Sequence, residues 1–217
     1  MQIIHRYVQQ GLYTPPGAVG LLIGTFPSVL VKQAFGRMRP SDVDFFYGSA
    51  ENNLWRDLSA IYDFPLAQQN TSTAVQQRLN LLQRLRLGIT DVVAATFTTG
   101  GATDASLQNI ELNTGITKTL GDHSTITKLY FTSGSGKVNA EGLTLNMLKE
   151  SGRVTNMQVI SKTSPRQRQF LFTSNGVRRL ITAITLYSPS PLAEQWGGVT
   201  PEKRRQQYRT YLPPLQD

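Results

Sequence analysis

Small and polar residues follow the first apolar run of the chain, and their types suit ligand binding. Val19–Ile23 is mostly apolar and ends abruptly in the turn Gly24–Ser28. Such a run predicts a buried parallel strand, whose end presents backbone N–H groups at the carboxyl edge of a sheet. Ligands bind at that edge in open α/β folds. An ordinary junction between a strand and a loop would have the same pattern, so both interpretations stay open.

A second turn with suitable chemistry is Ser133–Lys137, which is rich in glycine and serine and follows another apolar run. It lacks the residue order of a nucleotide-binding P-loop. The turn could form a phosphate-binding nest, or it could be a tight turn without a ligand.

The composition excludes several kinds of active site. The 217 residues include no cysteine and only two histidines, His5 and His123, far apart in the sequence. Disulfides, thiolate metal sites and cysteine nucleophiles are therefore excluded. We expect no metal site, and we predict that both histidines lie at the surface or cap helices. The absence of cysteine fits a reducing compartment, so we expect a cytoplasmic protein.

The chain is strongly basic. Its formal net charge of +8 predicts an anionic partner, with nucleic acid ahead of a membrane surface. No apolar run approaches the length of a membrane span and the start does not resemble a signal peptide, so we expect no membrane association. The length predicts one domain over residues 1–217, acting as a monomer.

Four apolar runs separated by helical patterns predict an α/β fold. They span residues 19–23, 90–95, 128–132 and 180–186. Right-handed crossovers would bring the loops after these runs to one side of the sheet. We predict a three-layer α/β/α sandwich around a central, mostly parallel four-stranded sheet. An additional hairpin is expected near residues 170–186, where Asn175-Gly176 indicates a turn.

Helical patterns lie between the runs. Apolar spacing predicts a helix over 54–61, and Thr73 and Gln76 form a capping box for the next one. Asp104–Leu112 reads as a short helix capped by its aspartate. Pro201 would begin a basic C-terminal helix.

Three segments together resemble motifs of the uracil-DNA glycosylase superfamily, in the branch of the hypoxanthine-DNA glycosylases and mismatch-specific uracil glycosylases. Gly24–Ser28 is similar to the first motif of that branch. Tyr47–Trp55 is similar to the pattern aromatic-x-His-Pro-x-Asn-x-Phe-Trp, and Ser188–Leu192 to His-Pro-Ser-Pro-Leu or Asn-Pro-Ser-Gly-Leu. Gly88–Val93 and Thr103–Leu107 resemble two segments that lie between these motifs.

The resemblance implies a monofunctional DNA glycosylase that removes uracil or hypoxanthine from DNA without a cofactor. Asn52 matches the family asparagine and would be the catalytic residue, although the same side chain could cap a helix. Tyr47 would stack on the flipped base. The base pocket would consist of Gly24, Thr25, Phe26, Pro27 and Tyr47. The DNA contacts would be Ser28, Ser188, Pro189, Ser190, Pro191 and Leu192, with Leu192 filling the gap left by the base.

Several positions depart from the family pattern. Phe26 stands where members with a strong base carry Asp or Asn, Ser49-Ala50 replaces His-Pro, and Ser188 replaces His or Asn. We therefore expect that no side chain of Gly24–Ser28 activates water and that the catalyst comes from the Asn52 segment. Two alternatives remain: a module of the same fold that binds DNA or a base without catalysis, and a small-molecule α/β enzyme acting on nucleosides.

Overall fold

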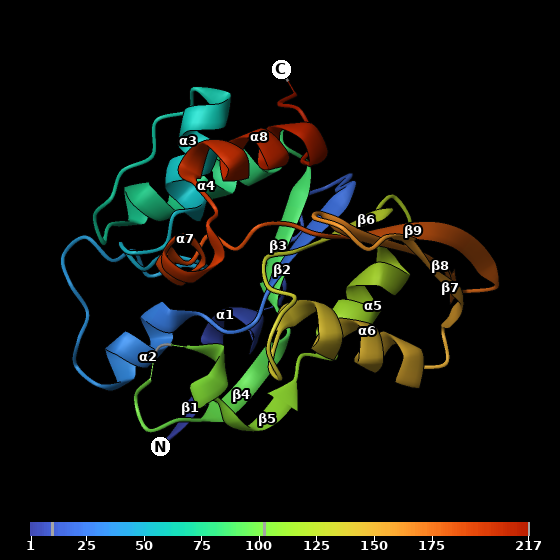
Figure 1. Ribbon diagram of the computed structural model, residues 1–217, viewed down its shortest axis with the longest axis horizontal. Coiled ribbons are helices and arrows are strands. Elements are labelled where there is room, and N and C mark those ends of the chain that lie inside the picture. The colour runs from blue at the N-terminus through green and yellow to red at the C-terminus, as the bar shows by residue number, and fades with distance from the viewer. Residues whose placement is uncertain (10, 102, 217) are drawn as a thin grey trace.

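The computed structural model describes residues 1–9, 11–101 and 103–216, which form two β-sheets with helices packed against them (Figure 1). The larger sheet has six strands in the order β3-β2-β6-β9-β8-β7, and the smaller has the order β1-β4-β5. The strands are β1 (Gln2–Ile4), β2 (Gly20–Gly24), β3 (Leu87–Asp91), β4 (Val93–Phe97), β5 (Gln108–Leu112), β6 (Lys128–Phe131), β7 (Val154–Ser161), β8 (Arg166–Ser174) and β9 (Val177–Thr185).

The helices alternate with the parallel strands along the chain. They are α1 (Arg6–Gln9), α2 (Ser28–Ala34), α3 (Leu54–Tyr62), α4 (Ser72–Arg84), α5 (Gly115–Asp122), α6 (Ala140–Glu150), α7 (Pro191–Gly197) and α8 (Pro201–Tyr211), with a 3-10 turn η1 (Asp104–Ser106). Within the described ranges, no helix is both long enough and apolar enough to span a membrane.

The prediction of an α/β fold is confirmed, but the predicted sheet of four strands was too small. β3, β2, β6 and β9 are parallel, and β8 and β7 extend the same sheet in antiparallel orientation. The hairpin at Asn175-Gly176 joins β8 to β9, with φ of 50° and 75° at the two turn residues. β7 was not predicted, because its four apolar residues, Val154, Met157, Val159 and Ile160, do not alternate with polar ones and most of the strand is exposed.

Two other predicted elements were wrong for a shared reason. The apolar run 90–95 is divided: β3 ends at Asp91, and the chain turns at Val92, whose N–H donates to the Gly24 carbonyl at 2.9 Å. Residues after the turn pair with β1 and β5 in the smaller sheet. The expected helix Asp104–Leu112 is a 3-10 turn followed by β5. Pairing with distant strands overrides local preference in both places.

Two of the predicted helices are confirmed. α3 and α8 lie where they were expected, and α8 begins with Pro201 behind the N-cap Thr200. The predicted capping box is displaced by two residues. Thr71 is the N-cap of α4, and its hydroxyl accepts from the Ala74 N–H at 3.2 Å.

Alternate side chains of the parallel strands enter two separate cores. Leu21 and Ile23 of β2 pack with apolar residues of α5 and α6, whereas Leu22 packs with residues of α3, α4 and α8. Helices therefore cover both faces of the parallel strands, as Figure 1 shows. The loops after β2, β3, β6 and β9 meet at the carboxyl edge between these helices.

A buried ion pair joins α3 to α8. Arg204 donates from Nε to Asp57 at 2.5 Å, and the side chains of both residues are only 1% exposed. Arg204 also contacts Glu194 of α7 at 2.8 Å, while the more exposed Arg205 reaches the other Asp57 oxygen at 2.9 Å. The network orients α7, and with it the loop before it, against the two longer helices.

We predict that Arg204→Ala lowers the free energy of unfolding by about 3–5 kcal/mol, because it leaves the Asp57 carboxylate buried without its main partner. Arg205→Ala is the matched control and should cost less than about 1 kcal/mol, because its side chain is 41% exposed and Arg204 still pairs with Asp57. Urea unfolding of both variants measures the difference. Equal losses would contradict the asymmetry.

Candidate functional site at the carboxyl edge

The strand order makes the boundary between β2 and β6 a topological switch point. β2 is the first of the parallel strands in the chain, β3 is its neighbour on one side, and β6 its neighbour on the other. The chain passes from β2 to β3 on one side and later from β3 to β6 on the other, and ligands bind at such switch points in α/β sheets. Thr25 follows β2, and Thr132 and Ser133 follow β6; Thr25 and Thr132 are buried, whereas Ser133 is partly exposed.

A directed chain of hydroxyls ends on a carboxylate at this edge. Thr25 Oγ1 donates to Asp104 Oδ2 at 2.7 Å and lies 2.8 Å from Ser133 Oγ. Because Thr25 has one hydroxyl proton, Ser133 is the donor in the second contact. Ser133 in turn accepts from the Ala140 N–H, at the start of α6, at 2.8 Å. Each bond polarises the next, and the chain terminates at Asp104.

The Asp104 carboxyl has an altered acidity. Burial raises its pKa to about 6, and the nearby Asp91 charge raises it too, while the hydrogen bond from Thr25 opposes the rise. The side chain is still only partly buried, so water can reach it. A carboxylate with this pKa is ionised at neutral pH and is a competent proton acceptor.

Gly24 permits a close approach between two polar groups. A Cβ at this position would lie 2.1 Å from Asp91 Oδ1 and 2.4 Å from the Tyr47 hydroxyl oxygen. The Tyr47 hydroxyl also lies 2.8 Å from Thr132 Oγ1, and burial raises its pKa well above the usual value. Tyr47 has φ of 52°, in the left-handed region that residues other than glycine seldom adopt. Such backbone strain is concentrated at functional sites.

His5 lies beneath this edge. It is fully buried, and its Nε2 is 2.9 Å from Asp91 Oδ2. The prediction that His5 lies at the surface or caps a helix was wrong, because the segment between β1 and α1 crosses the ends of β3 and β4. Nδ1 is buried without a hydrogen-bond partner among the described residues. His123, by contrast, caps α5 as predicted.

The loop that carries Tyr47 is held by α2. Lys32 of α2 lies 2.8 Å from Ser49 Oγ and 3.2 Å from Asp42 Oδ1. The same Asp42 oxygen accepts from the Ala50 N–H at 2.8 Å. Ser49-Ala50, the pair that departs from the family pattern, therefore has a local role in fixing this loop next to the turn after β2.

The second and third motif-like segments meet through the backbone. The Asn53 N–H donates to the Pro189 carbonyl at 2.9 Å, and the Asn53 amide nitrogen donates to Glu194 at 2.9 Å. Asn52 Oδ1 accepts from the Leu54 N–H at 3.0 Å. Asn52 thus serves at the start of α3, and no side-chain hydrogen bond in the described structure joins it to the Asp104 cluster.

The remaining predicted residues lie around the same edge. The Phe26 ring is partly buried against His5, with ring centroids 5.3 Å apart, and Pro27 is buried as the N-cap of α2. Ser28 begins α2 and is partly exposed.

In the Ser188–Leu192 loop, Pro189 is buried and Pro191 is the first residue of α7. Ser188 Oγ accepts from the Ser190 N–H at 3.2 Å, and Ser190 caps α7. Leu192, in the first turn of α7, is 43% exposed.

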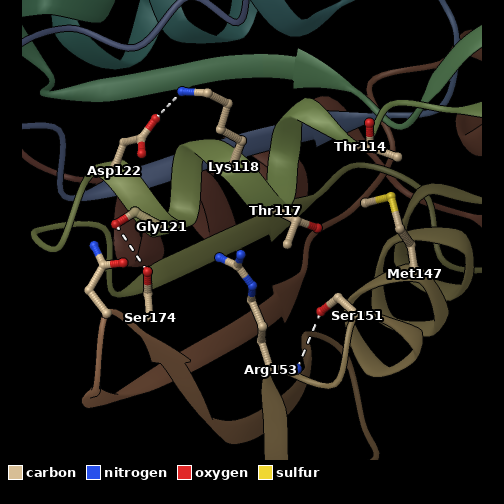
Figure 2. A pocket seen from close by; sticks show the side chains of 10 residues that line it. Thr114, Thr117, Lys118, Gly121, Asp122, Met147, Ser151, Arg153 and Ser174 are labelled. Atoms are coloured by element: carbon tan, nitrogen blue, oxygen red, sulfur yellow. Dashed lines mark hydrogen bonds and ion pairs between the residues drawn. The ribbon is translucent and has the colours of Figure 1, made fainter.

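A cavity of about 490 Å³ lies elsewhere, between α5, the end of α6 and the turn after β8 (Figure 2). Ser174 in its lining pairs near the start of β9, so the cavity lies toward the amino ends of the parallel strands. Figure 2 shows the Arg153 side chain pointing toward α5, with Ser174 on one side and Ser151 on the other, while Lys118 pairs with Asp122. This cavity shares no lining residue with the carboxyl-edge cluster.

Sequence reasoning did not single out Asp104 as a site residue or the hydrogen bond from Thr25 to it. The expectation that no side chain of Gly24–Ser28 activates water stays a prediction. The sequence signals at Asp104 were a polar residue in a loop and the resemblance of Thr103–Leu107 to a family segment. Across the described ranges, no group of three or more His, Asp or Glu residues is arranged to hold a metal ion.

Comparisons of the chain with protein-family models, with curated proteins and with solved structures found no match. The chemistry of the site is therefore inferred from its geometry.

The raised pKa of Asp104 predicts a pH-dependent stability difference. The folded protein keeps this proton until about pH 6, whereas an unfolded aspartate loses it near pH 3.9. The stability that protonated Asp104 contributes is thus present below about pH 4 and lost as pH rises through about 6. Relative to wild type, Asp104→Asn should become more stable across this window in urea unfolding.

Thr25→Val provides the control for this measurement. It removes the hydrogen bond that lowers the pKa of Asp104. The pH range over which stability is lost should therefore lie higher in this variant than in wild type. Parallel pH profiles for wild type and Asp104→Asn would show that the Asp104 pKa is not raised.

Proposed function

We propose that this protein is a DNA glycosylase that hydrolyses the N-glycosidic bond of a deaminated base, uracil or hypoxanthine, in DNA. The observation that carries the proposal is the convergence of three motif-like segments, distant in sequence, at one sheet edge. Tyr47 lies against Gly24 and hydrogen-bonds Thr132, and the Asn53 N–H binds the Pro189 carbonyl. Right-handed crossovers alone would bring the loops after parallel strands to one side of the sheet, so the support for the proposal lies in these direct contacts between the segments.

The arrangement of layers supports the same proposal. Helices on both faces of the parallel strands fit the three-layer α/β/α sandwich that the resemblance implies. The net charge of +8 suits a nucleic acid partner. The protein would act as a monomer in the cytoplasm, on DNA that contains damaged bases.

The proposed reaction forms a bond between a water oxygen and C1′ of the deoxyribose and breaks the bond from C1′ to the base nitrogen. The base leaves with the electron pair of that bond, and the sugar acquires oxocarbenium character. Asp104 would accept a proton from the attacking water, with Thr25 and Ser133 holding the carboxylate in place. The departing base would take its proton from solvent.

The resemblance implies Asn52 as the catalytic residue, but the proton acceptor in this proposal is Asp104. A neutral amide does not accept a proton at neutral pH, and the Asn52 oxygen is already bonded to the Leu54 N–H. The Asn52 amide nitrogen takes no part in the hydrogen bonds identified among the described residues, so it can still donate to a base carbonyl.

Binding of the flipped base would involve the first two segments. Backbone N–H groups of the turn after Gly24 would stabilise charge that develops on the departing base. Tyr47 would stack on the base, and Phe26 would close the pocket from below. Ser28, Ser188 and Ser190 would hydrogen-bond phosphates, and Leu192 would fill the vacated space in the duplex.

The central prediction concerns excision from duplex oligonucleotides that carry uracil or hypoxanthine, detected as alkali-cleavable abasic sites. Asp104→Asn should reduce kcat/KM by about 10²–10⁴-fold, the usual contribution of a general base. Because only the carboxylate accepts a proton, wild-type kcat/KM should fall about tenfold per pH unit below about pH 6. Above about pH 6 it should be level.

Matched variants test the assignment. Thr25→Val should move the acid limb to higher pH, because the lost hydrogen bond raises the pKa of Asp104. Asn52→Ala should leave the acid limb where it is. An acid limb that persists in Asp104→Asn would exclude Asp104 as the proton acceptor.

A second prediction separates the two parts of Tyr47. Tyr47→Phe keeps the ring, so base binding should change little, whereas Tyr47→Ala loses a stacking contact of about 1–3 kcal/mol. The Ala variant should therefore bind an abasic duplex as wild type does but bind a duplex with an uncleavable uridine analogue about 5–150-fold more weakly. Equal effects on both duplexes would point to a folding defect.

The capping role of Asn52 favours one alternative, a glycosylase-like module that binds DNA without catalysis. Such a module would show salt-dependent binding to DNA. It would produce no abasic sites at stoichiometric protein with any deaminated base. That result would replace the proposed function by the binding module.

A further inference from the structure

Basic residues are concentrated in one part of the chain. The stretch from Ser151 to Ala193 contains no Asp or Glu, although it spans β7, β8 and β9. Its six cationic residues are Arg153, Lys162, Arg166, Arg168, Arg178 and Arg179. This segment therefore accounts for most of the net charge of +8.

Three of these cations are held by partners within the fold. Arg166 and Arg168 both pair with Glu141, which is 5% exposed in the first turn of α6. Arg166 also donates to the Gly134 carbonyl and so supports the turn after β6. Arg179 donates to the carbonyl of Leu120, within α5, and to the carbonyl of Ile126, beyond its end. Their positive charges are in large part structural.

The other face of the same strands is open. Leu171 pairs with Leu180, and Thr173 pairs with Arg178, so these side chains lie on the face opposite α5 and α6. Lys128 of β6 pairs with Thr182 on this face. Further along, Ile184 and Tyr130 of the same face are buried under α8 and its neighbours.

We call the group Lys128, Gln169, Leu171, Thr173, Arg178, Leu180 and Thr182 the open β-face. Arg178 and Lys128 are exposed, and Leu180 is 51% exposed. Figure 1 shows β7, β8 and the adjoining part of β9 extending beyond α3, α4 and α8.

We propose that the open β-face binds the sugar–phosphate backbone of DNA. Its cations have no acidic neighbour within the three strands β7–β9, and its hydroxyl and amide groups are of the kinds that contact phosphates. The face is mainly polar, with Leu171 and Leu180 as its apolar pair, which fits a hydrated backbone better than an apolar protein partner.

The direction of β9 connects this face with the candidate site. From Arg178 to Thr182 the open part of the strand rises roughly 13 Å toward the carboxyl edge, enough to follow neighbouring phosphates of a duplex. Beyond it, Ile184 lies under α8 and its neighbours, and the Ser188–Leu192 loop follows the strand. DNA held on the open β-face would therefore pass over these helices to reach the edge where Leu192 and Asp104 lie.

This inference rests on the proposed function only for the choice of DNA as the anion. The test measures binding of the protein to an undamaged duplex oligonucleotide by fluorescence anisotropy, over a range of salt concentrations. Lys128→Ala/Arg178→Ala removes two charges from the open β-face. Lys118→Ala/Lys149→Ala removes two exposed charges from α5 and α6 on the opposite face and is the matched control.

The open-face double variant should bind at least about tenfold more weakly at ~0.1 M salt, and its slope of log K against log salt should be shallower by about two. The slope of log K against log salt for the control variant should lie within about 0.5 of the wild-type slope. Melting curves of both variants should match wild type, because all four side chains are exposed.

Unchanged binding by the open-face variant, or an equal loss in the control, would overturn the inference. Binding of the wild type to anionic lipid vesicles but not to duplex would overturn it in favour of a membrane surface. If the open-face variant excised the base and bound DNA as wild type does, this inference would be wrong and the proposed function would be retained. Binding through Lys128 and Arg178 without excision would retain this inference and remove the proposed function.

Discussion

The missing side chain at position 24 is the constraint on which the carboxyl edge depends. Parallel pairing brings Gly24 opposite Asp91, and the Tyr47 hydroxyl approaches from the other loop. Any Cβ would overlap both groups. A larger residue would force apart the end of β2 and the Tyr47 loop, and the contact between Tyr47 and Thr132 across to β6 would be lost with them. The end of β2, the end of β3 and the Tyr47 loop can therefore approach one another only because position 24 has no Cβ.

Buried charged groups fix the loops around this edge. Lys32 ties α2 to the segment before Asn52, and Arg204 ties α7 to α3 and α8. Buried ion pairs add little net stability compared with apolar packing, but they are directional. An apolar contact would allow these loops several orientations. The hydrogen bonds between the Arg204 guanidinium and the Asp57 carboxylate allow only a few orientations. The loops before and after these anchors are thereby aligned with the sheet edge.

The same logic explains how a basic chain divides its charge. Arg166, Arg168 and Arg179 are tied to Glu141 or to backbone carbonyls, so a count of basic residues overstates the charge open to a partner. Asp104 shows the converse: a single carboxylate among hydroxyls acquires a pKa of about 6 by burial. In both cases the environment, and not the residue type, decides what the group can do.

The sequence by itself determined the elements whose signals are local. The strand before Gly24, the strand over 128–131, the Asn175-Gly176 hairpin and the helices at Leu54 and Pro201 could all be predicted, because apolar period and turn residues act within a few positions. The resemblance also indicated the three segments that converge. It left open whether Asn52 acts in catalysis or caps a helix, and the structure shows its side chain accepting from Leu54 at the start of α3.

Only the tertiary structure decided where polar side chains meet. The turn at Val92, the burial of His5 and the chain from Ser133 through Thr25 to Asp104 all depend on contacts between residues distant in sequence. Strand pairing and burial draw their free energy from such distant partners, so the pattern of residues near Asp104 predicted a helix cap where the fold places a carboxylate at the site. The turn Gly24–Ser28 was recognisable from its residues, but its chemistry came from the neighbours that the fold supplies.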